Sequence, residues 1–322
     1  MNTLTLAHSG LAIPQLALGC MRITNLSKEE ARTLIETALE LGVNFFDHAN
    51  IYGNGMCESH FAQSLQMNSK IREKILLQTK CSIRYGISYD CSYQHIVQSV
   101  EESLARLQTE YLDSLLLHQP DALIEPEEVA KAFDALKAAG KVRHFGVSNF
   151  NTYQMKLLKK FCNVPLEFNQ LQLSLATSYL IDAGLNVNSF REGALNRDGM
   201  TLDYCRLNDI TIQAWSPYHK QGTDKVIIDN PDFERMNKCL KEVSEKYGIS
   251  KQALLIAWIN RHPAKIQTLL GTTNLERLKD TCTAATITLS REDWYKLYVS
   301  TGKFIAAVSN RTVEGELIPV QG

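Results

Sequence analysis

Short apolar segments and longer amphipathic segments alternate along almost the whole chain. Runs rich in Val, Ile, Leu and Phe that are bounded by turn residues are typical of buried strands, whereas apolar residues three and four positions apart are typical of helices. We therefore predict strands at residues 16–19, 43–46, 75–79, 113–117, 142–147, 165–169, 210–214 and 266–270. We predict a first helix that is capped by Asn25 or Ser27 and ends at residue 41. Further helices are predicted at residues 58–66, 93–107, 126–139, 152–161, 232–247, 250–260 and 275–284. Between residues 169 and 210 we expect a longer connection and a helix that ends near residue 208.

This alternation indicates the fold class. Strands that alternate with helices form parallel sheets with crossover connections. About eight strand–helix units fit a closed (β/α)8 TIM barrel better than a doubly wound sheet. Residues 3–17 predict a small N-terminal hairpin with a turn at Ser9 and Gly10, and residues 289–300 an extra C-terminal helix, whereas the pattern of residues 301–322 predicts no element. Because no linker-like segment divides the chain, we expect one α/β domain over residues 1–322.

Composition and charge narrow the classes of function. The chain has 322 residues, 44% of them hydrophobic, and a formal net charge of −1. A nearly neutral chain with evenly spread charges argues against nucleic acid or an anionic membrane as the main partner. No apolar run approaches the roughly 20 residues of a membrane helix, and no basic segment precedes an apolar one at the N-terminus. We therefore expect a cytoplasmic protein, monomeric, that binds a small molecule.

The eight cysteines point to neither metal nor disulfides. They form no C-x-x-C pair, and their spacings match no zinc module. Without an export signal, we expect reduced thiols in or near the core. No metal site is predicted.

Candidate chemistry lies where the predicted strands end. Asp47, Lys80 and His118 follow the second, third and fourth strands, and Tyr52 lies in the loop after the second. Each has an ordinary explanation by itself: a helix cap, a surface lysine, a histidine with satisfied hydrogen bonds, an incidental loop tyrosine. In a β/α barrel, however, the carboxyl ends of the strands meet at one rim, where active sites form. Four such residues at matching places therefore predict a catalytic site.

These four residue types suit carbonyl reduction. A tyrosine with a pKa near 10 is a weak acid at neutral pH, and a neighbouring ammonium group lowers that pKa. Lys80 could do this while Asp47 holds Lys80 by an ion pair. His118 could hydrogen-bond the oxygen that is protonated, or relay the proton. Lysine and tyrosine suit a zinc hydrolase poorly.

Three motifs carry a resemblance that extends over residues 4–283. They are L-G-C-M-R at residues 18–22, D-H-A-N-I-Y-G at residues 47–53 and G-K-V-R-H-F-G-V-S-N-F at residues 140–150. In these motifs the chain resembles the aldo-keto reductase family, and most closely its bacterial short-loop members. The resemblance implies that Asp47, Tyr52, Lys80 and His118 form the family's catalytic tetrad.

The resemblance also implies a cofactor, NADPH or NADP+, bound without a glycine-rich loop. It implies that Ser148, Asn149 and Gln170 hold the nicotinamide carboxamide and that Trp215 stacks on the ring. Gly271 stands where some family members have a lysine. Thr272 and Thr273 are expected to begin a helix whose N-terminus binds the 2′-phosphate of the cofactor, and Arg277 is expected to bind the same phosphate. The ordinary explanation for that segment is a threonine cap and a surface arginine. The other expected cofactor contacts are Gly19, Met21, Arg22, Ser216 and Pro217.

The function that follows is NADPH-dependent reduction of an aldehyde or ketone, with Tyr52 as general acid. The substrate pocket is expected to include Met21, Tyr52, Tyr85, Tyr89, Trp215 and Tyr218. Two alternatives stay open here. One is a non-catalytic regulatory or sensor protein of the same fold that binds NADP(H). The other is a different barrel enzyme, such as a phosphate-site isomerase, which would not bind a reduced nicotinamide.

Overall fold

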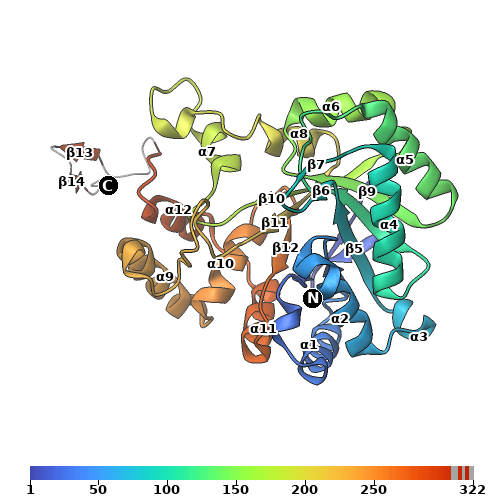
Figure 1. Cartoon of the computed structure of the whole chain (residues 1–322). Coiled ribbons are helices and arrows are strands. Elements are labelled where there is room, and N and C mark those ends of the chain that lie inside the picture. Colours follow the sequence, from blue (N-terminus) through green and yellow to red (C-terminus); the bar gives the residue numbers. More distant parts are fainter. Residues whose placement is uncertain (306–310, 314–315, 319–322) are drawn as a thin grey trace.

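Eight parallel strands form a closed barrel in the computed structural model, which describes residues 1–305, 311–313 and 316–318 (Figure 1). Their order around the barrel is β3-β4-β5-β8-β9-β10-β11-β12. The predicted (β/α)8 barrel is thus confirmed. The strands are β3 (Leu16–Gly19), β4 (Phe45–Asp47), β5 (Leu76–Cys81), β8 (Leu112–Leu117), β9 (Val142–Ser148), β10 (Leu166–Gln172), β11 (Thr211–Trp215) and β12 (Gln267–Leu270).

Helices surround the barrel, and their apolar faces pack on the strands. Ser27, and not Asn25, caps the first helix, because its hydroxyl accepts the Glu30 amide while the Glu30 carboxylate accepts the Ser27 amide. This reciprocal pair satisfies two backbone donors that the helix itself leaves open. The helices are α1 (Lys28–Glu40), α2 (Met56–Leu65), α3 (Ser69–Arg72), α4 (Tyr93–Leu107), α5 (Pro126–Ala138), α6 (Thr152–Phe161), α7 (Tyr179–Leu185), α8 (Thr201–Leu207), α9 (Glu234–Tyr247), α10 (Lys251–Asn260), α11 (Leu275–Cys282) and α12 (Arg291–Ser300).

The predicted N-terminal hairpin closes the amino-terminal end of the barrel. Strands β1 (Thr3–Thr5) and β2 (Ala12–Pro14) pair antiparallel, and Leu6 and Ile13 are fully buried. They pack inside the barrel against a ring of apolar side chains, one from each of five strands: Ala17, Phe45, Leu116, Phe168 and Leu269. Among the described residues, this apolar plug fills the amino-terminal end of the barrel, so a ligand would enter from the carboxyl-terminal end.

A layer of buried glutamines lies between the plug and that open end. The Gln78 side-chain amide donates to Asp47 Oδ1 at 2.7 Å and to Gln213 Oε1 at 2.9 Å. Gln213 in turn donates to Gln267 Oε1 at 2.8 Å. Because buried amides must be hydrogen-bonded, the layer fixes its members relative to one another and to Asp47.

Several predicted boundaries were wrong in ways that affect the site. Strand β4 begins at Phe45 rather than residue 43, and β5 continues to Cys81, so Lys80 lies inside a strand. Tyr52 lies in a 3-10 turn, Tyr52–Gly55, rather than in an open loop, and α2 follows at once from Met56. The connection after β10 holds two helices, α7 and α8, instead of one.

Other short elements were not predicted. They are α3 and the hairpin of β6 (Ile83–Arg84) and β7 (Ser88–Tyr89). The predicted C-terminal helix is confirmed as α12. Beyond it, β13 (Arg311–Val313) and β14 (Glu316–Ile318) pair antiparallel, whereas residues 306–310, 314–315 and 319–322 lie outside the described part of the chain.

Candidate active site

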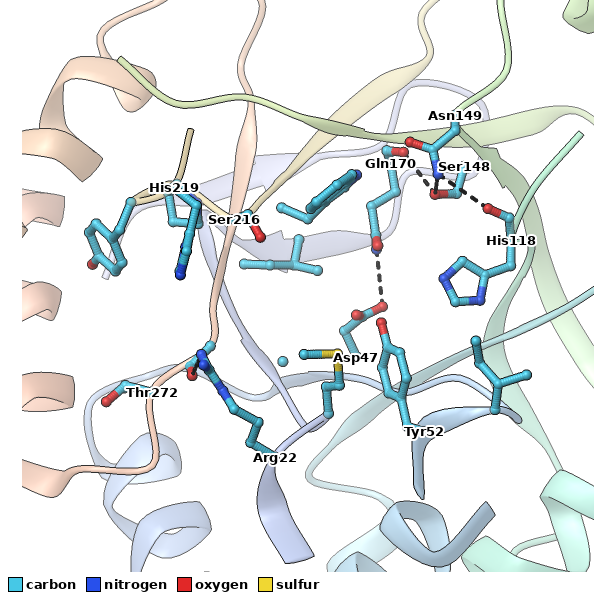
Figure 2. A pocket seen from close by; sticks show the side chains of 18 of the residues that line it. Arg22, Asp47, Tyr52, His118, Ser148, Asn149, Gln170, Ser216, His219 and Thr272 are labelled. Carbon is cyan, nitrogen blue, oxygen red and sulfur yellow. Dashed lines mark hydrogen bonds between the residues drawn. The ribbon is translucent and has the colours of Figure 1, made fainter. Parts of the chain in front are cut away.

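A cavity of about 830 Å³ opens at the carboxyl-terminal end of the barrel (Figure 2). All eight strands or the segments that follow them contribute to its wall. Of the predicted site residues, it is lined by Gly19, Met21, Arg22, Asp47, Tyr52, His118, Ser148, Asn149, Gln170, Trp215, Ser216, Pro217, Gly271, Thr272 and Arg277. Lys80 lies buried beneath its surface, and Thr273 is not part of the wall. Of the expected pocket tyrosines, Tyr85 and Tyr218 line the cavity, but Tyr89 does not and is exposed.

Lys80 connects three of the four predicted catalytic residues. Its side chain is fully buried, and its ammonium donates to Asp47 Oδ2 at 2.7 Å, to the His48 carbonyl at 2.8 Å and to the Tyr52 hydroxyl at 3.1 Å. A buried ammonium that lacked such partners would cost several kcal/mol. Three acceptors use its three N–H groups, so Lys80 is held rigidly, and two of these partners, Asp47 and Tyr52, line the cavity.

A short turn delivers Tyr52 to the cavity. Gly55, the last residue of this turn, has φ +86°, and a Cβ there would lie 2.8 Å from Arg106 Cδ. Arg106 donates to Glu58 Oε2 at 2.7 Å, and the buried Glu58 accepts the Thr79 hydroxyl at 2.6 Å through its other oxygen. Thr79 is the strand neighbour of Lys80. Through Arg106, Glu58 and Thr79, the turn that carries Tyr52 is therefore connected to the strand that carries Lys80.

The pKa of Tyr52 differs from the expectation. Burial raises the pKa of the Tyr52 hydroxyl and outweighs the lowering effect of Lys80, while Asp47 raises it further. Burial acts to lower the pKa of Lys80, but Asp47 and Tyr52 together raise it. In this form of the protein Tyr52 is therefore a protonated hydroxyl beside a charged ammonium. The predicted net lowering of the tyrosine pKa was wrong, although Lys80 acts in the predicted direction.

His118 is a neutral imidazole beside Tyr52. The two rings meet edge to face with centroids 5.9 Å apart. Burial, followed by the charge of Lys80, lowers the pKa of His118 to about 3. A neutral imidazole can donate one hydrogen bond but has no surplus proton to relay at neutral pH. Of the two roles predicted for His118, the geometry favours hydrogen bonding.

His48, which was not predicted as a site residue, holds Lys80 through its backbone carbonyl. It is fully buried, its ring lies edge to face with Phe61, and burial lowers its pKa to about 3. Neither ring nitrogen has a hydrogen-bond partner within the described residues. Its position directly after Asp47 was the available signal, because the same strand end that aims the carboxylate inward brings the His48 carbonyl to Lys80.

Polar side chains gather at the His118 end of the cavity, as Figure 2 shows. The Asn149 amide donates to Ser148 Oγ at 3.2 Å and to the His118 carbonyl at 3.3 Å, and Asn149 has φ +62°. Ser148 donates to the Gln170 carbonyl at 2.9 Å, and the Gln170 amide donates to Asp47 Oδ1 at 3.1 Å. Ser148, Asn149 and Gln170, which were predicted to hold a carboxamide, are thus neighbours, and Gln170 is hydrogen-bonded to Asp47.

Positive charge lies at the opposite end of the cavity. Arg22 crosses to the segment after β12 and donates to the Gly271 carbonyl at 2.6 Å (Figure 2). A Cβ at Gly271 would stand 3.1 Å from the Arg22 guanidinium, so a small residue suits this position. Arg277 lies in the first turn of α11 and also lines the cavity.

The segment just before α11 differs from the expectation, although the helix begins at Leu275 as predicted. Asn274, rather than a threonine, caps α11, because its side chain accepts the Arg277 amide at 2.8 Å. Thr272 lies just before this cap, and its hydroxyl accepts the Asn274 amide at 3.1 Å. Thr273 is half-buried outside the cavity wall.

Sequence reasoning missed another group at this end. His219 and Gln252 line the cavity, and burial together with Arg22 lowers the pKa of His219. His219 lies two residues after Pro217, which was an expected cofactor contact, and this position was the available signal.

These residues fit a dinucleotide. Two guanidinium groups and a helix N-terminus at one end suit phosphate, Trp215 offers an aromatic surface, and the amide and hydroxyl groups beside the tetrad suit a carboxamide. The volume also falls within the range of cofactor pockets, about 300–1,000 Å³. By contrast, the described residues contain no group of His, Cys, Asp or Glu side chains that could hold a metal ion, and all eight cysteines are free. In the same part of the chain, no helix combines the length and apolarity needed to cross a bilayer.

Known proteins resemble the chain in sequence over most of its length. A family model described as the aldo/keto reductase family matches residues 15–298. An uncharacterized oxidoreductase of Bacillus subtilis, YcsN, is 36% identical over 287 residues, which cover 86% of this chain and 89% of that protein. A 6-dehydroglucose reductase of Agrobacterium fabrum is 33% identical over 92% of this chain and 97% of its own. The oxidoreductase YdhF of Escherichia coli is 31% identical over 92% of this chain and 96% of its own.

A solved structure shares the fold. The crystal structure of the thermostable aldo-keto reductase Tm1743 in complex with the inhibitor epalrestat matches with a TM-score of 0.75 and 24% identity. The match covers 93% of this chain and all of that one, 100%.

Proposed function

The chain belongs to the aldo/keto reductase family, and on that premise we propose that it is an NADPH-dependent oxidoreductase that reduces an aldehyde or ketone to an alcohol. One observation carries the proposal. The buried Lys80 ammonium contacts both the Asp47 carboxylate and the Tyr52 hydroxyl at the floor of the cavity. This places the Tyr52 hydroxyl beside the space where a carbonyl would bind, with the Lys80 ammonium in position to stabilise the charge that forms when Tyr52 gives up its proton.

Each tetrad member has one task in this proposal. Tyr52 gives its proton to the carbonyl oxygen, and the Lys80 ammonium stabilises the phenolate that remains. Asp47 holds Lys80 in place and keeps it charged. Neutral His118 donates a hydrogen bond to the same carbonyl oxygen and so orients the substrate. A reduced nicotinamide, when bound, supplies the hydride that the carbonyl carbon receives.

The proposed cofactor contacts divide into three groups. Ser148, Asn149 and Gln170 bind the carboxamide, and Trp215 stacks on the ring. At the other end, Arg22, Thr272 and Arg277 bind phosphate groups, assisted by the N-terminus of α11. This arrangement favours NADPH over NADH, because the extra 2′-phosphate meets two guanidinium groups. Backbone and side chains of Gly19, Met21, Ser216, Pro217 and Gly271 complete the wall. Thr273 lies outside the cavity wall and makes none of these contacts.

Cofactor titration tests this assignment before any substrate is known. Trp215 is the tryptophan that lines the cavity, whereas Trp258 and Trp294 stack on each other in the core. We expect NADPH to quench the Trp215 fluorescence, to bind about 10- to 100-fold more tightly than NADH, and to be oxidised when an aldehyde is added. Trp215→Phe should remove the quenching signal. Binding of neither nucleotide would rule out the proposal.

The same titration separates the alternatives. NADPH binding without turnover of any carbonyl would favour the regulatory or sensor protein over the enzyme. The single-domain organisation, the monomeric state and the cytoplasmic location remain predictions.

A further inference from the structure

The cavity wall divides into two sectors. Five neighbouring strands, β9 to β12 and β3, carry all the residues proposed to bind the cofactor. The other three, β4, β5 and β8, carry the tetrad. In that second sector the remaining lining residues are Ile51, Gly53, Ile83, Tyr85 and Gln119. A substrate that reaches Tyr52 and His118 from outside must therefore pass a wall that is mostly apolar.

The hairpin β6–β7 supplies the outer part of this wall. It follows Lys80 by three residues, and its strands pair Ile83 with Tyr89 and Arg84 with Ser88. Ile83 is half-buried and lines the cavity, while Tyr85 at the turn also lines it but keeps 71% of its surface exposed. An exposed aromatic ring at a cavity mouth gains most when a bound molecule covers it.

The hairpin is fastened to the segment that carries His118. Ser82 Oγ contacts both the carbonyl and the amide of Gln119, each at 3.1 Å. The Cys91 amide donates to Asp121 Oδ2 at 3.0 Å on the other side of the hairpin. Its base is therefore fixed relative to His118, and Ile83 and Tyr85 hold defined positions beside the proton-donating groups.

We propose that hairpin β6–β7, through Ile83 and Tyr85, determines substrate specificity and selects aldehydes or ketones that carry an aromatic or branched apolar group next to the carbonyl. This inference rests on the proposed reductase function. Ile83 contacts the group near the carbonyl, and the Tyr85 ring covers its outer part. Apart from the tetrad, the polar groups that side chains of this sector of the described cavity wall offer to a substrate are the Gln119 amide and the Tyr85 hydroxyl.

Competing probe aldehydes test the proposal with NADPH as reductant. We compare benzaldehyde, propanal and glyceraldehyde, which are aromatic, small apolar and hydroxylated. The wild type should show the highest kcat/KM with benzaldehyde. Tyr85→Ala should lower the ratio of kcat/KM for benzaldehyde to that for propanal by about three- to tenfold, mainly through KM, because an aromatic contact is lost. Tyr85→Phe should keep the ratio near that of the wild type.

A tyrosine of the same hairpin provides the control. Tyr89 is exposed but does not line the cavity, so Tyr89→Ala should leave the ratio unchanged. The proposal is overturned if Tyr85→Ala affects both aldehydes equally or neither, or if the wild type prefers glyceraldehyde. In those cases the reductase assignment stands, because aldehydes are still reduced. If the wild type reduces none of the three, both proposals fall.

Discussion

At the scale of single residues, the site depends on groups whose charge is set by burial. Tyr52 stays protonated because its pKa is raised, and His118 stays neutral because its pKa is about 3. Neither group then changes charge near neutral pH. We predict that kcat for carbonyl reduction is nearly constant from about pH 6 to 9. A pH profile of kcat at saturating NADPH checks this, and a fall in rate with an apparent pKa near 6.5 would contradict a neutral His118.

The same buried histidines make stability depend on pH. His48 and His118 have pKa values of about 3 in the folded protein, against 6.5 for an exposed imidazole. Below pH 6.5 the unfolded chain therefore binds more protons than the folded one, so their contribution is complete above pH 6.5 and is lost as the pH falls. We predict that the free energy of unfolding decreases from about pH 6.5 downward, by at most about 1.4 kcal/mol per pH unit for each histidine.

Urea unfolding between pH 7.5 and 4.5 measures this slope. His48→Gln, which cannot gain a proton, should reduce the slope relative to the wild type. An equal slope in the two proteins would mean that His48 is already protonated or solvated in the folded state.

Sequence reasoning placed Asp47, Lys80 and His118 at one end of the barrel because strand ends can be located from apolar runs, and the structure brings these residues together. Their catalytic role stays a prediction. Sequence reasoning did not find the direction of the Tyr52 pKa shift, since that depends on how much protein covers the hydroxyl. Asn274 was missed as the cap of α11 because Thr272, Thr273 and Asn274 are all suitable cap residues, and only the folded chain shows which side chain reaches the Arg277 amide.

At the scale of elements, an ion pair between the buried Glu58 and the half-buried Arg106 holds the Tyr52 turn in place. Glu58 is fully buried, and its partner Arg106 packs on Gly55. We predict that Arg106→Met destabilises the protein by about 3–5 kcal/mol, because it leaves a buried carboxylate without its cation. It should also lower kcat, because the turn that aims Tyr52 loses its support, and Arg106→Lys should restore part of both losses.

An exposed pair gives the matched control. Arg32 and Glu36 lie on the surface of α1, so Arg32→Met should cost less than about 1 kcal/mol and leave kcat unchanged. Urea unfolding and steady-state rates measure both variants. Equal losses for Arg106→Met and Arg32→Met would show that the pair of Glu58 and Arg106 does not hold the turn.

Elements with a long periodic pattern were the ones that could be predicted. The bounds of α4 and α6 agree with the prediction, since both present an apolar face over three or four turns. The two-residue strands of the β6–β7 hairpin and the four-residue helix α3 are too short to show any period. Such short elements form because their residues contact other segments of the chain, as Ser82 contacts Gln119.

At the scale of the whole molecule, one carboxylate ties the long connection after β10 to the C-terminal helix. Asp182 in α7 is buried and accepts the Tyr298 hydroxyl at 2.7 Å and the Ser178 hydroxyl at 2.8 Å. Lys303 forms an ion pair with its other oxygen at 2.8 Å. We predict that Asp182→Ala lowers the free energy of unfolding by about 2–4 kcal/mol, since it leaves buried donors unsatisfied.

Hydrogen exchange locates this effect. Amides of α7 and α12 should exchange faster in Asp182→Ala, while those of β4 and β5 should not change. Faster exchange across the whole barrel would contradict a local tie.

The barrel itself was predictable because eight similar units repeat the same signal. The contacts of Asp182 with Tyr298 and Lys303 were not, because they join residues more than 100 positions apart, and neither the α7 segment nor residues after 300 has a strong pattern. Local periodicity therefore predicts the eight-strand frame, whereas the long-range polar contacts that complete the rim depend on the folded arrangement.

The central claim is that Tyr52 gives the proton during carbonyl reduction. The most direct test compares Tyr52→Phe with the wild type, in kcat with a reactive aldehyde and in the dissociation constant of NADPH. The account predicts that kcat falls by about 10²–10⁴-fold while NADPH affinity stays within about twofold, because the lost hydroxyl acts only in proton transfer. Turnover by Tyr52→Phe at the wild-type rate would contradict the account.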